Sequence, residues 1–286
     1  MMDHFCYYDL RGGRGSHDID VLFPDWSPGD ERVLVLSPHD DDALLGAGYA
    51  IAAVQENGGV AHIAICCDGS AGYSRVEDRE TIVDKRRQES LAAYGALGVP
   101  PDRVHYLGYP DFSLVGYLGW KLPSGRLGTL QPFVTLLRRI RVTRLMIPNG
   151  YREHLDHEAA YDLGRYDGIQ AGDPVGVDWG RPSAVRSVLQ YAVWADLSPE
   201  DALVAGAPTD IRANRALVAP YALEERIAEA LAAWQSQQKI IAGLLKQRRE
   251  RDSGDGMVEL YLAMDPRPKL DYGPYVALLN RLPVGD

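Results

Sequence analysis

From residue 31 onward the chain alternates short apolar segments with longer amphipathic ones, and this alternation restricts the fold more than any other feature. The short segments are mainly apolar throughout, as is typical of strands that are buried on both faces of a sheet. They are RVLVLSP at 32–38, VAHIAICCDGSAG at 60–72 (a strand running into a loop), RVHYLGY at 103–109 and RLMIPNG at 144–150. Helical patterns follow them, at 43–59, 79–99, 129–142 and 156–166.

This order predicts the fold class. Repeated strand–helix–strand units give a parallel sheet with right-handed crossovers. We therefore expect an α/β fold, a Rossmann-like sandwich with a mainly parallel central sheet and helices on both faces. In such sheets, ligands bind at the carboxyl ends of the strands.

The two ends of the chain depart from this pattern. Residues 1–30 show no sustained period and predict an irregular N-terminal arm. Residues 31–286 predict a single domain, with a further strand at 184–194 and a long C-terminal helix near 219–252. An apolar stripe on that helix indicates packing against the core; it comprises Leu223, Ile227, Leu231, Trp234, Ile241 and Leu245. The arm and the helix are the surfaces we expect for a homo-oligomer.

Charge and composition exclude several classes of partner. The chain has 30 Lys and Arg against 40 Asp and Glu, a formal net charge of −10, which argues against nucleic acid or an anionic membrane. Its longest uncharged apolar run, at 43–54, is too short to span a bilayer. Three cysteines and no secretory leader predict a cytoplasmic protein without a disulfide framework.

The stretch SPHDDD at 37–42 places three carboxylates behind a histidine at the end of a buried strand. His39 and Asp42 are three residues apart at a strand-to-helix junction, so both side chains can face one point. Imidazole with carboxylate is a common donor pair for a divalent transition metal. The alternative is that the aspartates cap the helix that begins near Ala43.

A second polar segment follows the fourth strand. His154, Asp156 and His157 lie within YREHLDH, at the same predicted edge of the sheet as SPHDDD. A third protein ligand from this segment would complete a catalytic metal site that keeps one position for water. The two segments together favour metal binding over helix capping.

The residues of both segments resemble a known family. VLVLSPHDDDALLGAGYAIA, then KRRQESLAAYGALGV, then HLDH, is similar in content and order to the zinc-dependent PIG-L/LmbE family of N-acetylglucosaminyl deacetylases. The similarity covers roughly residues 32–200. The resemblance implies that His39, Asp42 and His157 hold the metal, Zn²⁺ or alternatively Fe²⁺.

The resemblance also implies catalytic roles. Asp41 matches the family's general base, and His154 matches its catalytic histidine. Asp156, between the two histidines, is expected to orient His154 and favour its charged form. On this basis a metal-activated water would attack the acetyl carbonyl, and Asp41 or His154 would return a proton to the leaving amine.

Substrate contacts are expected from Arg86 in RRQE and from Asp111 in GYPDFS. Arg86 and Glu89 have a helical spacing that fits an internal salt bridge equally well. The implied substrate is a small N-acetylglucosamine-type molecule. Another N-acyl conjugate, such as a thiol conjugate or an antibiotic intermediate, and a non-catalytic sugar-binding module are the alternatives.

Three positions differ from the family pattern. Asp40 and Leu155 stand where relatives often have proline, and Tyr151 is three residues before His154 instead of two. No physical reason for Asp40 follows from the sequence, and any role of Tyr151 in stabilising an oxyanion stays open.

Overall fold

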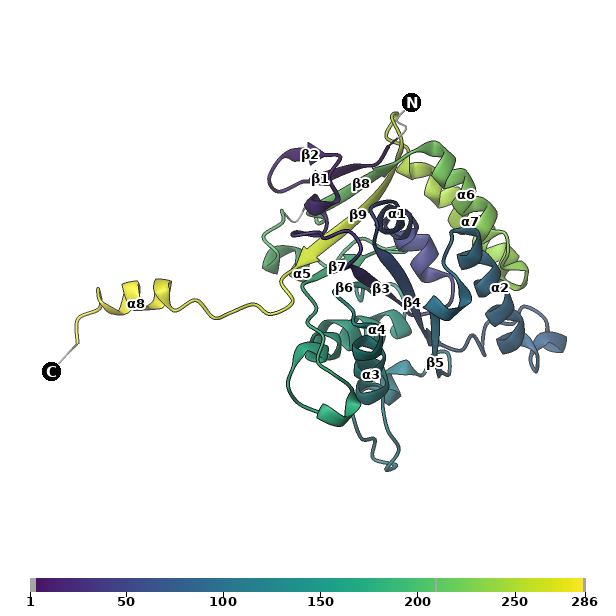
Figure 1. The fold of residues 1–286 in the computed structure, drawn as a ribbon, viewed down its shortest axis with the longest axis horizontal. Helices are drawn as coiled ribbons and strands as arrows, with labels where there is room; N and C mark the ends of the chain where they lie inside the picture. The colour runs from purple at the N-terminus through teal and green to yellow at the C-terminus, as the bar shows by residue number, and fades with distance from the viewer. Residues whose placement is uncertain (1–3, 209, 285–286) are drawn as a thin grey trace.

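A nine-stranded sheet forms the centre of the computed structural model, which describes residues 4–208 and 210–284 (Figure 1). The strand order is β2-β1-β8-β9-β7-β6-β3-β4-β5. The strands are β1 (Cys6–Asp9), β2 (Arg14–Ser16), β3 (Arg32–Ser37), β4 (Val60–Cys67), β5 (Val104–Tyr109), β6 (Arg144–Pro148), β7 (Ser187–Tyr191), β8 (Arg215–Ala219) and β9 (Met257–Met264).

The sheet is mixed, so the prediction of a mainly parallel sheet was wrong. Strands β7, β6, β3, β4 and β5 are parallel neighbours, as the repeating strand–helix pattern predicts. The other four strands extend this block through antiparallel pairings of β9 with β7, β8 with β9, β1 with β8 and β2 with β1. These strands come from the two ends of the chain, where no strand–helix repeat signals a partner.

Helices cover both faces of the sheet, as predicted (Figure 1). Side chains of β3 show the division, because Val33 and Val35 pack in one hydrophobic core while Leu34 and Leu36 pack in the other. Helices α1, α2, α6 and α7 contribute to the first core, and α3 and α4 to the second. The helices are α1 (Asp42–Glu56), α2 (Ile82–Ala96), α3 (Leu130–Ile140), α4 (Leu155–Asp162), α5 (Pro199–Val204), α6 (Tyr221–Leu231), α7 (Gln238–Arg248) and α8 (Gly273–Leu279).

The first 30 residues are more regular than predicted. Tyr7 of β1 lies opposite Leu217 of β8, so a segment near the start of the chain extends the sheet next to one more than 200 residues away. The prediction of an irregular arm was therefore wrong for β1 and β2. Its first three residues lie outside the described residues.

The long helix predicted over 219–252 is two shorter helices, α6 and α7. The chain leaves the helical conformation at Trp234, which has φ −77° and ψ 70°. The indole of Trp234 is buried, and its Nε1 donates a hydrogen bond to Asp40 Oδ2 at 2.9 Å. The predicted stripe nevertheless packs in the core, because all six of its residues are buried or packed against the buried cluster.

The last helix, α8, lies away from the sheet at the end of an extended segment (Figure 1). All of its residues are exposed. Among the described residues, no helix is long and apolar enough to cross a membrane.

The carboxyl ends of the parallel strands bring four loops together. The loops after β4 and β5 are joined by a hydrogen bond from Gly69 N–H to Asp111 Oδ1, at 2.9 Å. The loop after β5 is joined to the start of α4 by a hydrogen bond from Phe112 N–H to Asp156 Oδ2, at 2.6 Å. The segments that the sequence predicts to share one edge are therefore in contact.

Candidate metal centre

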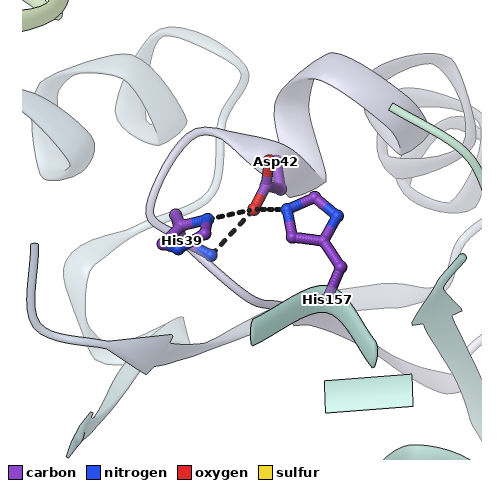
Figure 2. Close-up of side chains that lie close together, drawn as sticks. All are labelled: His39, Asp42 and His157. Atoms are coloured by element: carbon purple, nitrogen blue, oxygen red, sulfur yellow. Dashed lines mark hydrogen bonds and ion pairs between the residues drawn. The ribbon is translucent and has the colours of Figure 1, made fainter. Parts of the chain in front are cut away.

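The three predicted metal ligands lie side by side at this edge (Figure 2). His39 follows β3, Asp42 is the first residue of α1, and His157 lies on α4. Ser37 fixes the turn between β3 and α1, because its hydroxyl accepts the Ala43 N–H at 2.9 Å and donates to the His39 carbonyl. The turn thereby directs both motif side chains to one point.

Asp42 is the centre of the cluster. Its Oδ2 lies 3.1 Å from His39 Nδ1 and 3.0 Å from His157 Nε2 (Figure 2). The same oxygen accepts the His39 backbone N–H at 2.8 Å. Asp41, the residue before α1, makes no side-chain capping bond to it. The carboxylates of Asp41 and Asp42 therefore do not cap α1, which was the alternative interpretation of the sequence.

The surroundings favour positive charge between these residues. Asp42 and His157 are almost fully buried. Burial alone would raise the pKa of Asp42, but the adjacent His157 and His39 hold it well below its usual range. Burial would lower the pKa of His157, yet the carboxylates of Asp42 and Glu153 raise it to about 9.

The donor set fits a divalent transition metal. His157 Nε2 is buried and forms an ion pair at 3.0 Å with Asp42 Oδ2, itself a candidate ligand atom, so a metal ion would take the place of the proton between them. Two imidazole nitrogens and one carboxylate oxygen are typical of catalytic Zn²⁺ and non-haem Fe²⁺ sites. His39, Asp42 and His157 therefore have both the chemistry and the proximity for one ion.

Asp41 is buried next to Asp42 in the chain. Burial, together with the negative charges of Asp42 and Asp40, raises the pKa of its carboxyl to about 7. Its Oδ1 lies 3.8 Å from Arg86 Nη2. A carboxyl group that exchanges a proton near neutral pH has the property that a general base requires.

Asp40 has a different set of partners. Its carboxylate is paired with the guanidinium of Arg86, through Nη2 and through Nε at 3.2 Å, and it also accepts the Trp234 indole N–H. Its backbone carbonyl accepts the Tyr94 hydroxyl at 2.8 Å. The three neighbouring aspartates therefore have three separate environments.

Asp156 does not make the contact with His154 that the sequence analysis expected. Its Oδ2 lies 3.3 Å from His39 Nε2, and its two oxygens accept the N–H groups of Phe112 and Leu114. The distance to His154 Nδ1 is 3.7 Å, which is longer than a hydrogen bond. Asp156 is therefore hydrogen-bonded to the candidate ligand His39 and is only an electrostatic neighbour of His154.

His154 lies at the edge of the centre. Its Nδ1 accepts the Asp156 backbone N–H at 3.1 Å, so the neutral ring carries its proton on Nε2. Burial lowers the pKa of His154, and the nearby His39 lowers it further. The ring is partly exposed and lies 4.9 Å from the ring of His39, which leaves its Nε2–H as a donor for a bound molecule.

Glu153 is a member of the site that the sequence analysis missed. Its Oε2 accepts His157 Nδ1 at 2.8 Å, and its Oε1 accepts three backbone N–H groups that follow β7. It precedes His157 by four residues and lies just before α4, whose N-cap residue is His154. That spacing is the signal that could have identified it.

The two expected substrate residues are both buried. Arg86 is paired with Asp40, and the oxygens of Asp111 accept the N–H groups of Gly69 and Ala71. Both residues thus hold loops beside the site, and their contact with substrate stays a prediction. The salt bridge considered for Arg86 and Glu89 is not formed, because Glu89 accepts hydrogen bonds from Ser236 instead.

Two exposed aromatic side chains flank the metal residues. The ring of Phe112 lies 4.6 Å from the ring of His154, and the ring of Trp194 lies 4.8 Å from that of His157. Phe112 has a left-handed backbone, with φ 58°. Tyr151 packs instead against the guanidinium groups of Arg152 and Arg212. The aromatic rings of Phe112 and Trp194 therefore flank the centre on two sides.

Residues 34–166 match the profile of one protein family, described as PIG-L, GlcNAc-PI de-N-acetylase. This segment contains His39, Asp41, Asp42, Glu153, His154, Asp156 and His157. Curated protein sequences gave no significant match.

Several solved structures share the fold. A conserved protein from Thermus thermophilus has a TM-score of 0.62 at 23% identity, covering 84% of this chain and 98% of that one. N,N'-diacetylchitobiose deacetylase from Pyrococcus horikoshii has 0.59 at 17% identity, covering 87% and 90%. A 4-carboxy-2-hydroxymuconate hydratase from Pseudomonas putida has 0.61 at 19% identity, covering 84% and 99%. At these identities the likeness concerns the fold.

Proposed function

We propose that the chain belongs to the PIG-L family, whose profile matches residues 34–166, and that it is a metal-dependent amide hydrolase that removes an acetyl group from an N-acetylglucosamine-type substrate. The observation that carries the proposal is the cluster of His39, Asp42 and His157, with the buried carboxyl of Asp41 beside it. The relative from Pyrococcus horikoshii, named as a deacetylase of an acetylated sugar, supports the substrate class.

His39, Asp42 and His157 would hold the ion, which we propose to be Zn²⁺, with Fe²⁺ as the alternative. Such an ion lowers the pKa of a bound water towards about 7 and polarises a carbonyl oxygen. The protein side of the reaction then needs a base for the water and a donor for the oxyanion and the leaving amine.

Asp41 is our candidate for the base. It precedes a metal ligand in the chain, and its carboxylate makes no capping bond to α1, so its oxygens are free to accept a proton. The guanidinium of Arg86, 3.8 Å away, is an electrostatic neighbour that favours the charged form of this carboxylate. The proton taken from water can be returned to the nitrogen of the leaving amine.

His154 is our candidate for the oxyanion donor. Because its Nδ1 accepts a backbone N–H, its Nε2–H is the donor available to a substrate carbonyl. Its partly exposed ring, in contact with Phe112, lies where a substrate can reach it.

The charge of the site favours this chemistry. Five carboxylates surround the centre, namely those of Asp40, Asp41, Asp42, Glu153 and Asp156. The guanidinium of Arg86 is paired with one of them, Asp40. A neutral sugar that releases an amine suits such a site better than an anionic muconate, the kind of substrate named for the related hydratase. Phe112 and Trp194 offer flat apolar surfaces for the sugar ring.

The proposal is tested with the purified full chain and a panel of N-acetylated compounds. The panel contains N-acetylglucosamine, N,N'-diacetylchitobiose and an N-acetyl thiol conjugate, each assayed for amine release with and without added Zn²⁺ and Fe²⁺. We expect metal-dependent release from an acetylated sugar. Amine release only from the thiol conjugate would mean that the substrate is a thiol conjugate and not a sugar. A protein that binds metal but releases no amine from any compound would contradict the proposed hydrolase activity.

A further inference from the structure

Glu153 has an unusual set of contacts for a carboxylate next to a metal site. Its side chain is fully buried at the start of α4. One oxygen, Oε2, accepts His157 Nδ1 at 2.8 Å. The other, Oε1, accepts the backbone N–H groups of Val193, Trp194 and Ala195 at 2.7, 2.9 and 3.1 Å.

These contacts fix the proton on His157. Both oxygens of the Glu153 carboxylate act as acceptors, Oε1 for three backbone N–H groups and Oε2 for the imidazole of His157. Nδ1 of His157 must therefore carry a hydrogen. The other nitrogen, Nε2, which forms an ion pair with Asp42 at 3.0 Å, is then the one that gives up its proton and offers its lone pair when a metal ion binds.

The same carboxylate also holds one wall of the site. The three N–H groups belong to the segment that follows β7, and the middle residue of that segment is Trp194. The ring of Trp194 packs on the ring of His157. One buried side chain thus joins a metal ligand on α4 to an aromatic wall from another strand.

We propose that Glu153 is a positioning residue that sets the tautomer of His157 for metal coordination and holds Trp194 over the centre. The inference rests on the metal centre of the proposed function. It does not depend on which compound is the substrate.

Replacing Glu153 with Gln separates this role from packing, because the two side chains have nearly the same shape. If the amide oxygen faces the three N–H groups, the amide NH₂ faces His157 and forces the proton onto Nε2, which blocks coordination. If the amide is reversed, its NH₂ faces three backbone donors and the segment that carries Trp194 is displaced. Neither orientation preserves both functions of the carboxylate.

The experiment measures Co²⁺ and Zn²⁺ affinity by competition with a chelator dye, and the melting temperature of the metal-free protein. We expect Glu153→Gln to weaken metal binding by roughly 10- to 100-fold, the usual effect of losing the outer hydrogen bond of a ligand histidine. Glu153→Asp keeps the charge and should lose less. Glu158→Gln is the matched control, since Glu158 is an exposed neighbour on the same helix and should bind metal as the wild type does.

A second measurement needs no variant. A long-range ¹H–¹⁵N spectrum of the metal-loaded wild-type protein should show the His157 ring protonated at Nδ1. Protonation at Nε2, or metal affinity of Glu153→Gln equal to that of the wild type, would overturn the inference. A wild-type protein that binds no metal would instead refute the proposed function, so the two failures are distinguishable.

Discussion

Asp40 and Arg86 form a buried ion pair directly behind the proposed base, with Arg86 Nη2 also 3.8 Å from Asp41 Oδ1. This pair gives a physical account of Asp40, for which the sequence analysis found no reason. Asp40 balances a buried guanidinium and accepts the indole N–H of Trp234. Asp40 therefore connects the loop between β3 and α1, which carries His39, to α2 and to the break between α6 and α7.

We predict that Asp40→Asn destabilises the protein by about 3 kcal/mol, because it leaves the Arg86 charge buried without its partner. The amide oxygen still accepts the Trp234 N–H, so the loss reports the ion pair. Chemical unfolding at neutral pH, followed by circular dichroism, measures it. The double variant Asp40→Asn with Arg86→Met should recover at least half of the loss, since no unpaired charge remains.

The matched control is the partly exposed pair of Lys85 and Asp78, whose atoms Nζ and Oδ1 are 2.8 Å apart. Asp78→Asn should cost less than about 1 kcal/mol, as surface ion pairs do. Equal losses for Asp78→Asn and Asp40→Asn would show that burial of the Asp40 pair has no energetic consequence.

Metal binding should stabilise the folded chain. At a free Zn²⁺ concentration about 100-fold above the dissociation constant, the expected gain in unfolding free energy is about 2.7 kcal/mol. Differential scanning calorimetry with and without a chelator measures this gain. His157→Ala removes a buried ligand and should abolish it, whereas His4→Ala, at an exposed position, should leave it unchanged. A Zn²⁺ response that survives in His157→Ala would place the ion elsewhere.

The residues of the metal cluster could be predicted because each lies at a strand end or first helical turn, where local spacing decides which side chains meet. His39 and Asp42 are related by a single turn, and His154, Asp156 and His157 by another. Glu153 carries a similar local signal, in its distance of four residues from His157. The pairing of Asp40 with Arg86 has no such signal, because it depends on how α2 packs against the loop after β3.

The antiparallel half of the sheet could not be predicted for the same reason. Strand β1 has four residues without a clear alternation, and its register with β8 is set by a contact across the whole chain. The break at Trp234 is also a tertiary effect. The apolar stripe continues through it at helical spacing, but the indole turns inward to reach Asp40.

Asp41→Asn should reduce kcat by about 10²- to 10⁴-fold, since an amide cannot accept the proton of water. Metal content should be unchanged, because Asp41 is not one of the three clustered ligands. Steady-state amine release and metal analysis of the same sample test both statements. Full activity with bound metal would assign the base to another residue.

The backbone of Phe112 should lower the stability of the protein, whereas its ring should contribute to substrate binding. Its left-handed backbone costs a non-glycine residue about 1 kcal/mol or more, while its exposed ring buries little surface. We expect Phe112→Gly to be about 1 kcal/mol more stable than Phe112→Ala, and both to raise KM similarly by losing the ring. Thermal unfolding and steady-state kinetics of the pair test this. Equal stabilities would mean that the backbone is unstrained, and an unchanged KM would mean that the ring does not contact substrate.

His62 should make the fold sensitive to acid. Burial, together with the charges of His105 and Arg103, lowers the pKa of His62 to about 4. Between pH 6.5, its ordinary value, and pH 4, the unfolded chain binds more protons at this position, so stability falls as pH falls.

His62→Gln should remove about 1–2 kcal/mol of that loss, an amount reduced from the full shift because the ring is partly exposed. Urea unfolding of variant and wild type at pH 7 and pH 4 measures the difference, and His4→Gln serves as the exposed control. Parallel losses in the two variants would show that His62 titrates as it does in the unfolded chain.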